Sequence, residues 1–199
     1  FFLYLAIKKK RNGIARALLT RTEVFRHKLG IEPVIVTADY DRELVEHYHY
    51  LVKNQYISEQ TPYLNMYADF QGTDFSGSSL HAAGSNSPDG NDDVAEVEVV
   101  SGGGGRKFWT EERQLIKYEI IDPISGRLRF INLFANKKIV GRLHYDSNGF
   151  LSRKEYIEPE SGLKVSDTYF RVDGTPVIEK HFYRKNDRAV LGTIYILDR

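Results

Sequence analysis

The sequence has no cysteine, and methionine and tryptophan occur only once each. The absence of cysteine excludes disulfide-linked scaffolds and zinc sites built on thiolates. Long apolar runs are also missing. The longest run, Phe1–Ile7, is far too short to span a bilayer, and a positive cluster follows it instead of preceding it as in a secretory signal. Neither sign of charge is in excess, since 28 Lys and Arg face 27 Asp and Glu, which argues against a general nucleic-acid binder.

The 199 residues suffice for one or two domains with a buried core, and 13 Tyr with 11 Phe favour abundant β-strand. The near-zero net charge hides three blocks of different composition. Residues 1–60 carry 10 basic and 7 acidic side chains, residues 61–105 carry 7 acidic side chains and no basic one, and residues 106–199 carry 18 basic and 13 acidic ones. The blocks predict a chain of three segments.

The first block predicts an α/β unit. Phe1–Ile7 and Pro33–Thr37 have the continuous apolar character of buried parallel strands, and Asn12 and Asp41 are placed to cap the helices that follow them. Gly30 fits the position that ends the first helix. The expected apolar stripe of that helix consists of Ile14, Leu18, Thr22, Phe25 and Leu29, widened by Ala15 and Leu19. This order is the start of a doubly wound, Rossmann-like sheet, but two strands do not make a sheet that folds alone.

Within the second block, residues 72–105 are acidic and rich in glycine and serine, so we expect a flexible loop there with Val94–Val100 as a short edge strand. The third, residues 106–199, has turn-like clusters about every 11–13 residues, separated by alternating apolar and polar runs. Asn148-Gly149 and Asp173-Gly174 are strong hairpin signals. The expected fold class is α+β, in which an incomplete α/β start of residues 1–71 precedes a large antiparallel meander of about seven strands.

The turn after the first strand is the most suggestive candidate site. Lys8–Arg11 and Gly13 place four cations and a glycine before a helix N-terminus, where an anion such as a phosphate can bind. The competing interpretation is a solvated turn with an Asn12 cap, in which Arg16 is an ordinary exposed helix residue. Gly102–Gly105 superficially resembles a phosphate loop, but it lacks the Gly-Lys-Ser/Thr ending and is better read as a linker.

Other patterns carry less chemistry. Asp39 and Asp41 are spaced to chelate a cation, although a helix cap at Asp41 and a solvated Asp39 are favoured. The spacing Asp89, Asn91 and Asp93 begins like a calcium loop, but Val94 stands where that loop needs glycine and Val100 where it needs glutamate. The histidines show no ligand spacing; His47 and His49 point to different faces of a helix, and His144 and His181 are expected on sheet faces.

Two parts of the sequence resemble one protein family. Asn12–Phe25 resembles the first β–α turn and helix of bacterial retaining GT-B glycosyltransferases. Tyr63–Gln71 and strand–turn modules such as Leu143–Arg153 resemble the extended β-sheet domain inserted in one subgroup, the cell-wall teichoic-acid glycosyltransferases and the enzymes that glycosylate serine-rich adhesins. The resemblance covers most of the chain outside residues 72–105.

The resemblance implies a division of labour. Asn12, Gly13, Ile14 and Arg16 would face the diphosphate of a UDP-sugar donor, and the sheet domain of residues 106–199 would bind a teichoic-acid polymer or serine-rich protein and mediate oligomerisation or pairing with a partner subunit. In the family the paired glutamates and the main donor site belong to a C-terminal Rossmann domain. This chain is therefore expected to be an N-terminal part that is not catalytic by itself, with no catalytic residue, metal or further cofactor.

The same resemblance implies a cytoplasmic protein, peripheral at the membrane, with no transmembrane segment and no nucleic-acid partner. A different class remains open, namely a non-catalytic interaction module that docks on a partner glycosyltransferase or self-associates. A third hypothesis, a surface protein of Tyr-Asp repeats, rests on a single copy, Tyr145–Leu151, and does not account for the α/β start.

Overall fold

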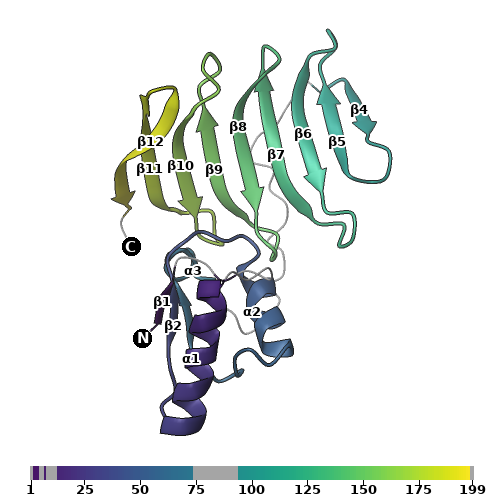
Figure 1. Cartoon of the computed structure of the whole chain (residues 1–199). Helices are drawn as coiled ribbons and strands as arrows, with labels where there is room; N and C mark the ends of the chain where they lie inside the picture. Colours follow the sequence, from purple (N-terminus) through teal and green to yellow (C-terminus); the bar gives the residue numbers. More distant parts are fainter. Residues whose placement is uncertain (1, 5–6, 8–12, 74–93, 198–199) are drawn as a thin grey trace. The chain divides into compact units, whose positions relative to one another are not determined.

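The structure is a computed structural model that describes residues 2–4, 7, 13–73 and 94–197. It divides into two compact units, residues 1–78 and residues 79–199. The first combines helices with a small parallel sheet, and the second is a long antiparallel sheet (Figure 1). In the described residues, no helix combines the length and the apolar character that crossing a membrane requires.

The first unit is a three-stranded parallel sheet with connecting helices. Its strands, in the spatial order β1-β2-β3, are β1 (Phe2–Tyr4), β2 (Ile35–Thr37) and β3 (Tyr63–Asn65). Its helices are α1 (Gly13–Leu29), α2 (Leu44–Lys53) and α3 (Met66–Gln71). Because β2 pairs with β1 and β3 with β2, the two connections advance in one direction, as in half of a doubly wound sheet.

The core of this unit joins its three helices to the sheet. Its buried side chains are Ile7, Leu18, Leu19, Ile35, Leu44, Leu51, Ile57, Tyr63 and Ala68. Burial raises the pKa of Tyr63 to about 12. The apolar stripe of α1 differs from the predicted one, because Ala15, Leu18, Leu19 and Thr22 are buried whereas Ile14 is 66% exposed.

The ends of the helices agree with the sequence in part. Gly30 has a φ of +64° and follows α1, as predicted, with the Ile31 amide donating to the Phe25 carbonyl at 3.2 Å. The prediction that Asp41 caps α2 is wrong, since Glu43 occupies the N-cap position without a side-chain hydrogen bond. Asp41 instead accepts from the Glu43 amide at 3.0 Å. The predicted Asn12 cap lies outside the described residues.

The sequence missed β3 and α3, because only three residues form the strand. Tyr63–Gln71, which resembles the extended sheet domain in sequence, belongs to the α/β unit instead. Asn65 makes the transition possible: it ends β3 in an extended conformation, and its side chain accepts a hydrogen bond from the Ala68 amide as the N-cap of α3.

The second unit is a nine-stranded antiparallel meander in which each strand pairs with its neighbours in sequence (Figure 1). Its strands are β4 (Glu96–Val99), β5 (Gly105–Trp109), β6 (Leu115–Ile121), β7 (Leu128–Ala135), β8 (Lys138–Tyr145), β9 (Leu151–Ile157), β10 (Lys164–Phe170), β11 (Pro176–Lys185) and β12 (Arg188–Ile196). The predicted antiparallel meander is confirmed.

The expected count of about seven strands is too low. Gly102, Gly103 and Gly104 lie in the turn between β4 and β5, where Gly102 and Gly103 adopt positive φ, and Gly105 begins β5, so part of the expected loop is a hairpin. The turn between β5 and β6 contains no glycine, and Arg113 takes the left-handed conformation at a φ of 57°. A turn without Gly, Pro or Asn gives no sequence signal, which is why this strand boundary was missed.

Candidate functional site

The carboxyl ends of β2 and β3 are joined by one side chain. Asn65 Nδ2 donates to Thr37 Oγ1 at 2.9 Å and to the Asp39 carbonyl at 2.9 Å, while its Oδ1 accepts from the Ala68 amide at 3.0 Å. Both Asn65 and Thr37 are buried. Asn65 therefore fixes the segment that follows β2 to the start of α3, at the edge where open α/β sheets bind their ligands.

A buried contact between a histidine and a carboxylate lies in the same segment. His47 Nδ1 is 2.6 Å from Asp41 Oδ2, and the Nε2 atom of the same ring is 3.7 Å from Glu43 Oε2. The side chains of His47 and Asp41 are 7% and 9% exposed. The Asp41 carboxylate thus contacts the start of α2 and the His47 ring, whereas Asp39 is exposed. Of the favoured interpretation of the sequence, the exposed Asp39 is confirmed, whereas the helix cap at Asp41 is wrong.

The candidate donor residues lie in the first turns of α1. Gly13 is the first residue of the helix, and a Cβ atom placed on it would meet no atom of the described residues within 4 Å, apart from its chain neighbours and the helix's own backbone. Ile14 and Arg16 are exposed on the same helix. Asn12 and the Lys8–Arg11 cluster lie outside the described residues.

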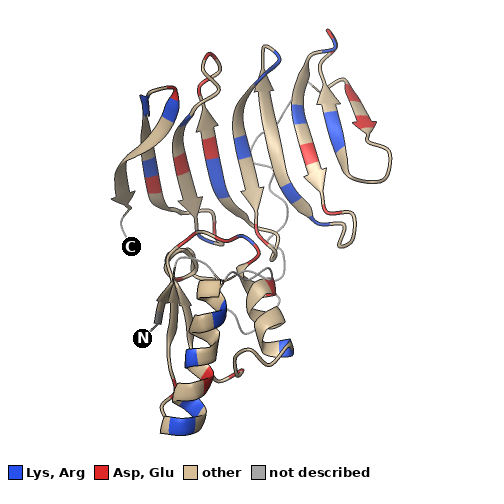
Figure 2. Cartoon of the chain, in the orientation of Figure 1, with Lys and Arg blue, Asp and Glu red and all other residues tan. Residues whose placement is uncertain are grey.

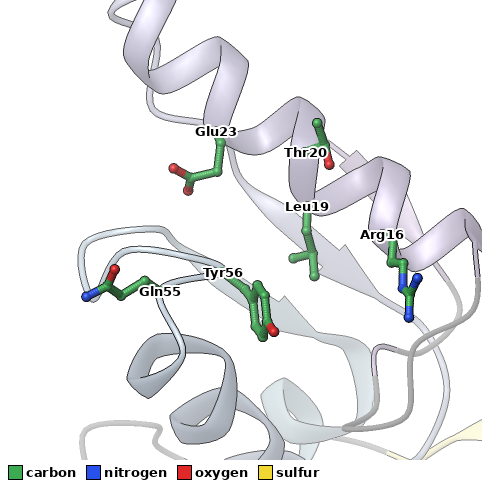
Figure 3. Close-up of a pocket in the computed structure, with 6 residues that line it drawn as sticks. All are labelled: Arg16, Leu19, Thr20, Glu23, Gln55 and Tyr56. Carbon is green, nitrogen blue, oxygen red and sulfur yellow. The ribbon is translucent and has the colours of Figure 1, made fainter.

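Arg16 also borders a hollow between α1 and the segment after α2 (Figure 3). The hollow has a volume of about 310 Å³ and is lined by Arg16, Leu19, Thr20, Glu23, Gln55 and Tyr56. Figure 3 shows Arg16 and Glu23 at different turns of α1 and Gln55 and Tyr56 on the opposite side. A guanidinium, a carboxylate, a hydroxyl, an amide and a phenol ring thus line one small space.

The weaker sequence candidates are not assembled into sites. Gly102–Gly105 belongs to the β4–β5 hairpin, as described above, and Asp89, Asn91 and Asp93, which have the calcium-like spacing, fall outside the described residues. Within the part of the chain that the structure describes, no group of three or more His, Cys, Asp or Glu could hold a metal ion.

One face of the antiparallel sheet carries a dense cluster of charges, which we call the charged face. Strand register defines it, because residues paired directly across antiparallel strands lie on the same face. Its first row is Tyr118, Asn132, Arg142, Glu155, Asp167 and Lys180, and its second row is Ile120, Phe130, His144, Arg153, Tyr169 and Ile178. Figure 2 shows charged bands across the middle of β8 to β11.

Glu155 is the centre of this cluster. Its carboxylate binds the Arg153 guanidinium, lies 3.1 Å from His144 Nε2 and is 3.8 Å from Arg142 Nη1. Arg142 Nε also donates to Asn132 Oδ1 at 2.7 Å, and its guanidinium lies 5.4 Å from the centroid of the Phe130 ring. Burial, and to a smaller degree the neighbouring Arg153, lowers the pKa of Arg142. Two guanidinium groups are thus held close together by one carboxylate.

A second buried carboxylate continues the cluster on β10. Asp167 is 1% exposed, and its Oδ2 accepts from Lys164 Nζ at 2.8 Å. Lys180, on the neighbouring strand β11, places its ammonium 5.6 Å from the centroid of the Tyr169 ring. On strands β8–β11 the two rows hold three cations, Arg142, Arg153 and Lys180, and Lys164 adds a fourth at Asp167, against the two carboxylates of Glu155 and Asp167. The excess is positive.

Sequence reasoning missed the charged face, although a signal was present. Charged or polar residues recur at every second position, as in Arg142 and His144 or Arg153 and Glu155, which places them on one face of a strand. What the sequence did not show was the register between strands. His144 and His181 lie on the sheet as predicted, on β8 and β11.

Comparison with known proteins gives a likeness of structure only. No protein-family model matches the chain, and no curated protein matches its sequence. TarM matches over 98% of this chain at 17% identity, with a TM-score of 0.76. A Staphylococcus aureus TarM variant, in complex with fondaparinux, alpha-GlcNAc-glycerol and UDP, matches with a TM-score of 0.73. The pneumococcal O-GlcNAc transferase GtfA, in complex with UDP and GlcNAc, matches over 96% at 16% identity and a TM-score of 0.61.

Structures of protein complexes match as well. The Gap123 glycosylation-associated protein complex from Streptococcus agalactiae matches over 90% of this chain at 18% identity, with a TM-score of 0.62. This chain spans 38% of the matched TarM and GtfA chains and 32% of the matched Gap123 chain. The chain has the fold of a part of the TarM and GtfA glycosyltransferases.

Proposed function

We propose that this chain is the N-terminal part of a retaining bacterial glycosyltransferase that moves a sugar from a UDP-sugar to a teichoic-acid or serine-rich protein acceptor, in the cytoplasm and at the membrane surface. The observation that carries the proposal is that a parallel α/β unit and a long antiparallel meander occur together in one chain, and that TarM matches 98% of it. Either unit alone would fit many functions.

In this proposal the α/β unit contributes one wall of the donor cleft. Asn12, Gly13, Ile14 and Arg16 are the proposed donor residues, because they belong to the turn and helix that follow β1. The amides of such a helix N-terminus attract the negative charge of a diphosphate. The open space at the Cβ position of Gly13 supports this role, since no atom of the described residues lies within 4 Å of it apart from the chain neighbours and the helix's own backbone.

The donor role is tested by Gly13→Val in the complete enzyme. A Cβ atom at Gly13 meets no atom of the described residues within 4 Å beyond its chain neighbours and its own helix backbone, so the variant should fold normally and a lower turnover would report on the ligand. Ala17→Val, which adds the same side chain at an exposed position of α1, is the matched control. Equal turnover in the two variants would remove Gly13 from the donor site.

The charged face is the proposed acceptor surface. Its four cations and two carboxylates on β8–β11 leave a positive excess, and residues 106–199 as a whole carry 18 basic and 13 acidic side chains. A phosphate-rich polymer would bind such a surface through charge-assisted hydrogen bonds. The complex of the TarM variant with fondaparinux supports an anionic ligand for a protein of this fold.

Binding of teichoic-acid fragments to the chain tests the acceptor role. We expect affinity that falls as salt rises, since exposed charges are screened. Lys180→Gln should weaken binding, whereas Lys138→Gln should not, because Lys138 begins β8 at a hairpin and pairs with Glu160 at 3.0 Å. Binding that ignores salt, or equal effects of both substitutions, would reject the charged face as the acceptor surface.

A non-catalytic interaction module is the second candidate. Its support is that the matched structures include chains of the Gap123 and GtfA/B complexes, the latter at a TM-score of 0.61. In this case the long sheet docks on a partner glycosyltransferase or on itself. Size-exclusion chromatography with light scattering on the isolated chain tests self-association, and a strict monomer would leave only the partner-bound form.

A further inference from the structure

We propose that the hollow between α1 and the segment after α2 binds a sugar or polyol that carries one anionic group. Its volume of about 310 Å³ lies at the lower end of the range of small-molecule sites, about 300–1,000 Å³. This size suits a compact ligand rather than a nucleotide or a polymer. The hollow lies within the α/β unit and does not involve the nine-stranded sheet.

The charges in the hollow favour an anion at one end. Glu23 is already neutralised, because Arg26 Nη2 donates to its two carboxylate oxygens at 3.0 and 2.8 Å and His27 Nε2 lies 3.0 Å away. Arg16, by contrast, makes no ion pair or hydrogen bond with another residue of the described chain. The guanidinium of Arg16 is therefore the charge that a phosphate or carboxylate group would satisfy.

The distance between the Arg16 end and the Glu23 end of the hollow fits one sugar ring. Arg16 and Glu23 are seven residues apart on α1, which corresponds to about 10 Å along the helix axis. An anionic group at Arg16 would thus leave room for one ring before the carboxylate of Glu23. Held in place by Arg26 and His27, this carboxylate would accept hydrogen bonds from hydroxyl groups at the far side of the ring.

The walls between the ends offer both surfaces that a sugar needs. Leu19 is 4% exposed and forms an apolar floor, and Tyr56 supplies an aromatic ring. Thr20 and Gln55 add a hydroxyl and an amide. Backbone hydrogen bonds hold this segment in place. The backbone N–H of Gln55 donates to the Val52 carbonyl, and the backbone N–H of Tyr56 donates to the Leu51 carbonyl, both at 2.9 Å. A ring with an apolar face and hydroxyl edges matches this lining.

The test uses the whole chain and three probes: glucose 1-phosphate, glucose and inorganic phosphate. Amide chemical shifts of the lining residues should move in a saturable way with glucose 1-phosphate, and less with either of the other two. Arg16→Gln should weaken the affinity about tenfold, the effect of losing one charge-assisted hydrogen bond. Arg21→Gln, which removes an exposed arginine of α1 that does not line the hollow, should leave it unchanged.

Two further arms separate this site from the proposed donor turn. Gly13→Val should not change the affinity, since Gly13 does not line the hollow, and Glu23→Gln should weaken it. Binding that Gly13→Val abolishes, an equal response to inorganic phosphate alone, equal losses in Arg16→Gln and Arg21→Gln, or no saturation at about 10 mM probe would each overturn the proposal. Its failure would leave the glycosyltransferase proposal intact, because that rests on the fold of both units.

Discussion

Asp146, in the turn between β8 and β9, provides a sharp test of how burial acts on this sheet. Its Oδ1 accepts hydrogen bonds from the amides of Asn148 at 2.8 Å and Phe150 at 3.3 Å. Asp173 forms a similar turn between β10 and β11 and accepts from the Thr175 amide at 2.8 Å. Asp146 is buried and Asp173 is exposed, so the two carboxyl groups share a motif but differ in solvation.

The two pKa values move in opposite directions for this reason. Burial raises the pKa of Asp146 from 3.8 to about 6, against the effect of its hydrogen bonds, whereas hydrogen bonds from Thr175 lower the pKa of Asp173. The raised pKa means that the folded state favours protonated Asp146. The stability contributed by this group is therefore complete below pH 3.8 and is lost as the pH rises through about 6. A shift of about two units corresponds to about 3 kcal/mol.

We expect Asp146→Asn to remove this loss, because the amide is neutral at every pH and its oxygen can still accept the two backbone hydrogen bonds. The variant should match the wild type near pH 4 and exceed its free energy of unfolding by up to about 3 kcal/mol at pH 8. Urea denaturation followed by fluorescence measures this directly, since Trp109, the single tryptophan, lies in β5 of the same sheet. The difference between variant and wild type cancels the titration of other groups.

Asp173→Asn is the matched control. Its carboxyl has a lowered pKa, so its contribution to stability is present above the unfolded pKa and is lost as the pH falls, and the amide should give no gain at pH 8. The reasoning would be refuted if Asp146→Asn were less stable than the wild type at pH 8, or if the two asparagine variants changed stability equally across this pH range.

Three further predictions concern single positions. Gly105→Ala should destabilise the sheet by about 3 kcal/mol, since the new Cβ would lie 2.2 Å from the Glu119 carbonyl oxygen. The urea midpoint of tryptophan fluorescence measures this, and Gly104→Ala, whose Cβ has open space, should change that midpoint very little. Asn65→Ala should cost the α/β unit about 2 kcal/mol, measured as faster hydrogen exchange of the β3–α3 amides; unchanged exchange would contradict its bridging role. Gln55→Gly should stabilise α2 by about 1 kcal/mol in the same exchange experiment, because Gln55 has a φ of 57°, and a loss would contradict this.

The sequence predicted the α/β unit where its signals were local. Gly30 ended α1 as expected, because a left-handed residue after a helix is strongly specified by glycine. The cap at Asp41 failed because α2 begins later, with Glu43 at its N-cap, and the Asp41 carboxylate contacts the Glu43 amide and the His47 ring. Strand β3 was missed because three residues carry too little periodicity to identify a strand.

The sheet was predictable as a meander, but its charged face was not. Alternation along each strand assigns side chains to two faces, and a one-residue change of register would exchange them. Register shifts occur in the pairing of several strands, for example between Leu133 and Phe134, so the rows that join Arg142, Glu155 and Asp167 could not be read from spacing alone. The structure supplies this register. The grouping of these charged side chains on one face therefore comes from the structure, whereas the excess of basic residues in 106–199 comes from the composition.

The in-order pairing of β4 to β12 has a consequence for how the sheet unfolds and how it can change in length. Each strand contacts mainly its two neighbours, so the sheet is close to a one-dimensional array, in which stability is a sum of nearest-neighbour terms. Its end strands carry mostly exposed side chains, whereas β8–β10 contain buried ones, so opening should start at both ends and protection should rise toward the middle. A hairpin such as β11–β12 can therefore be added or lost at an end without breaking any pairing in the remaining strands, which makes the width of the sheet free to vary while its centre stays the same.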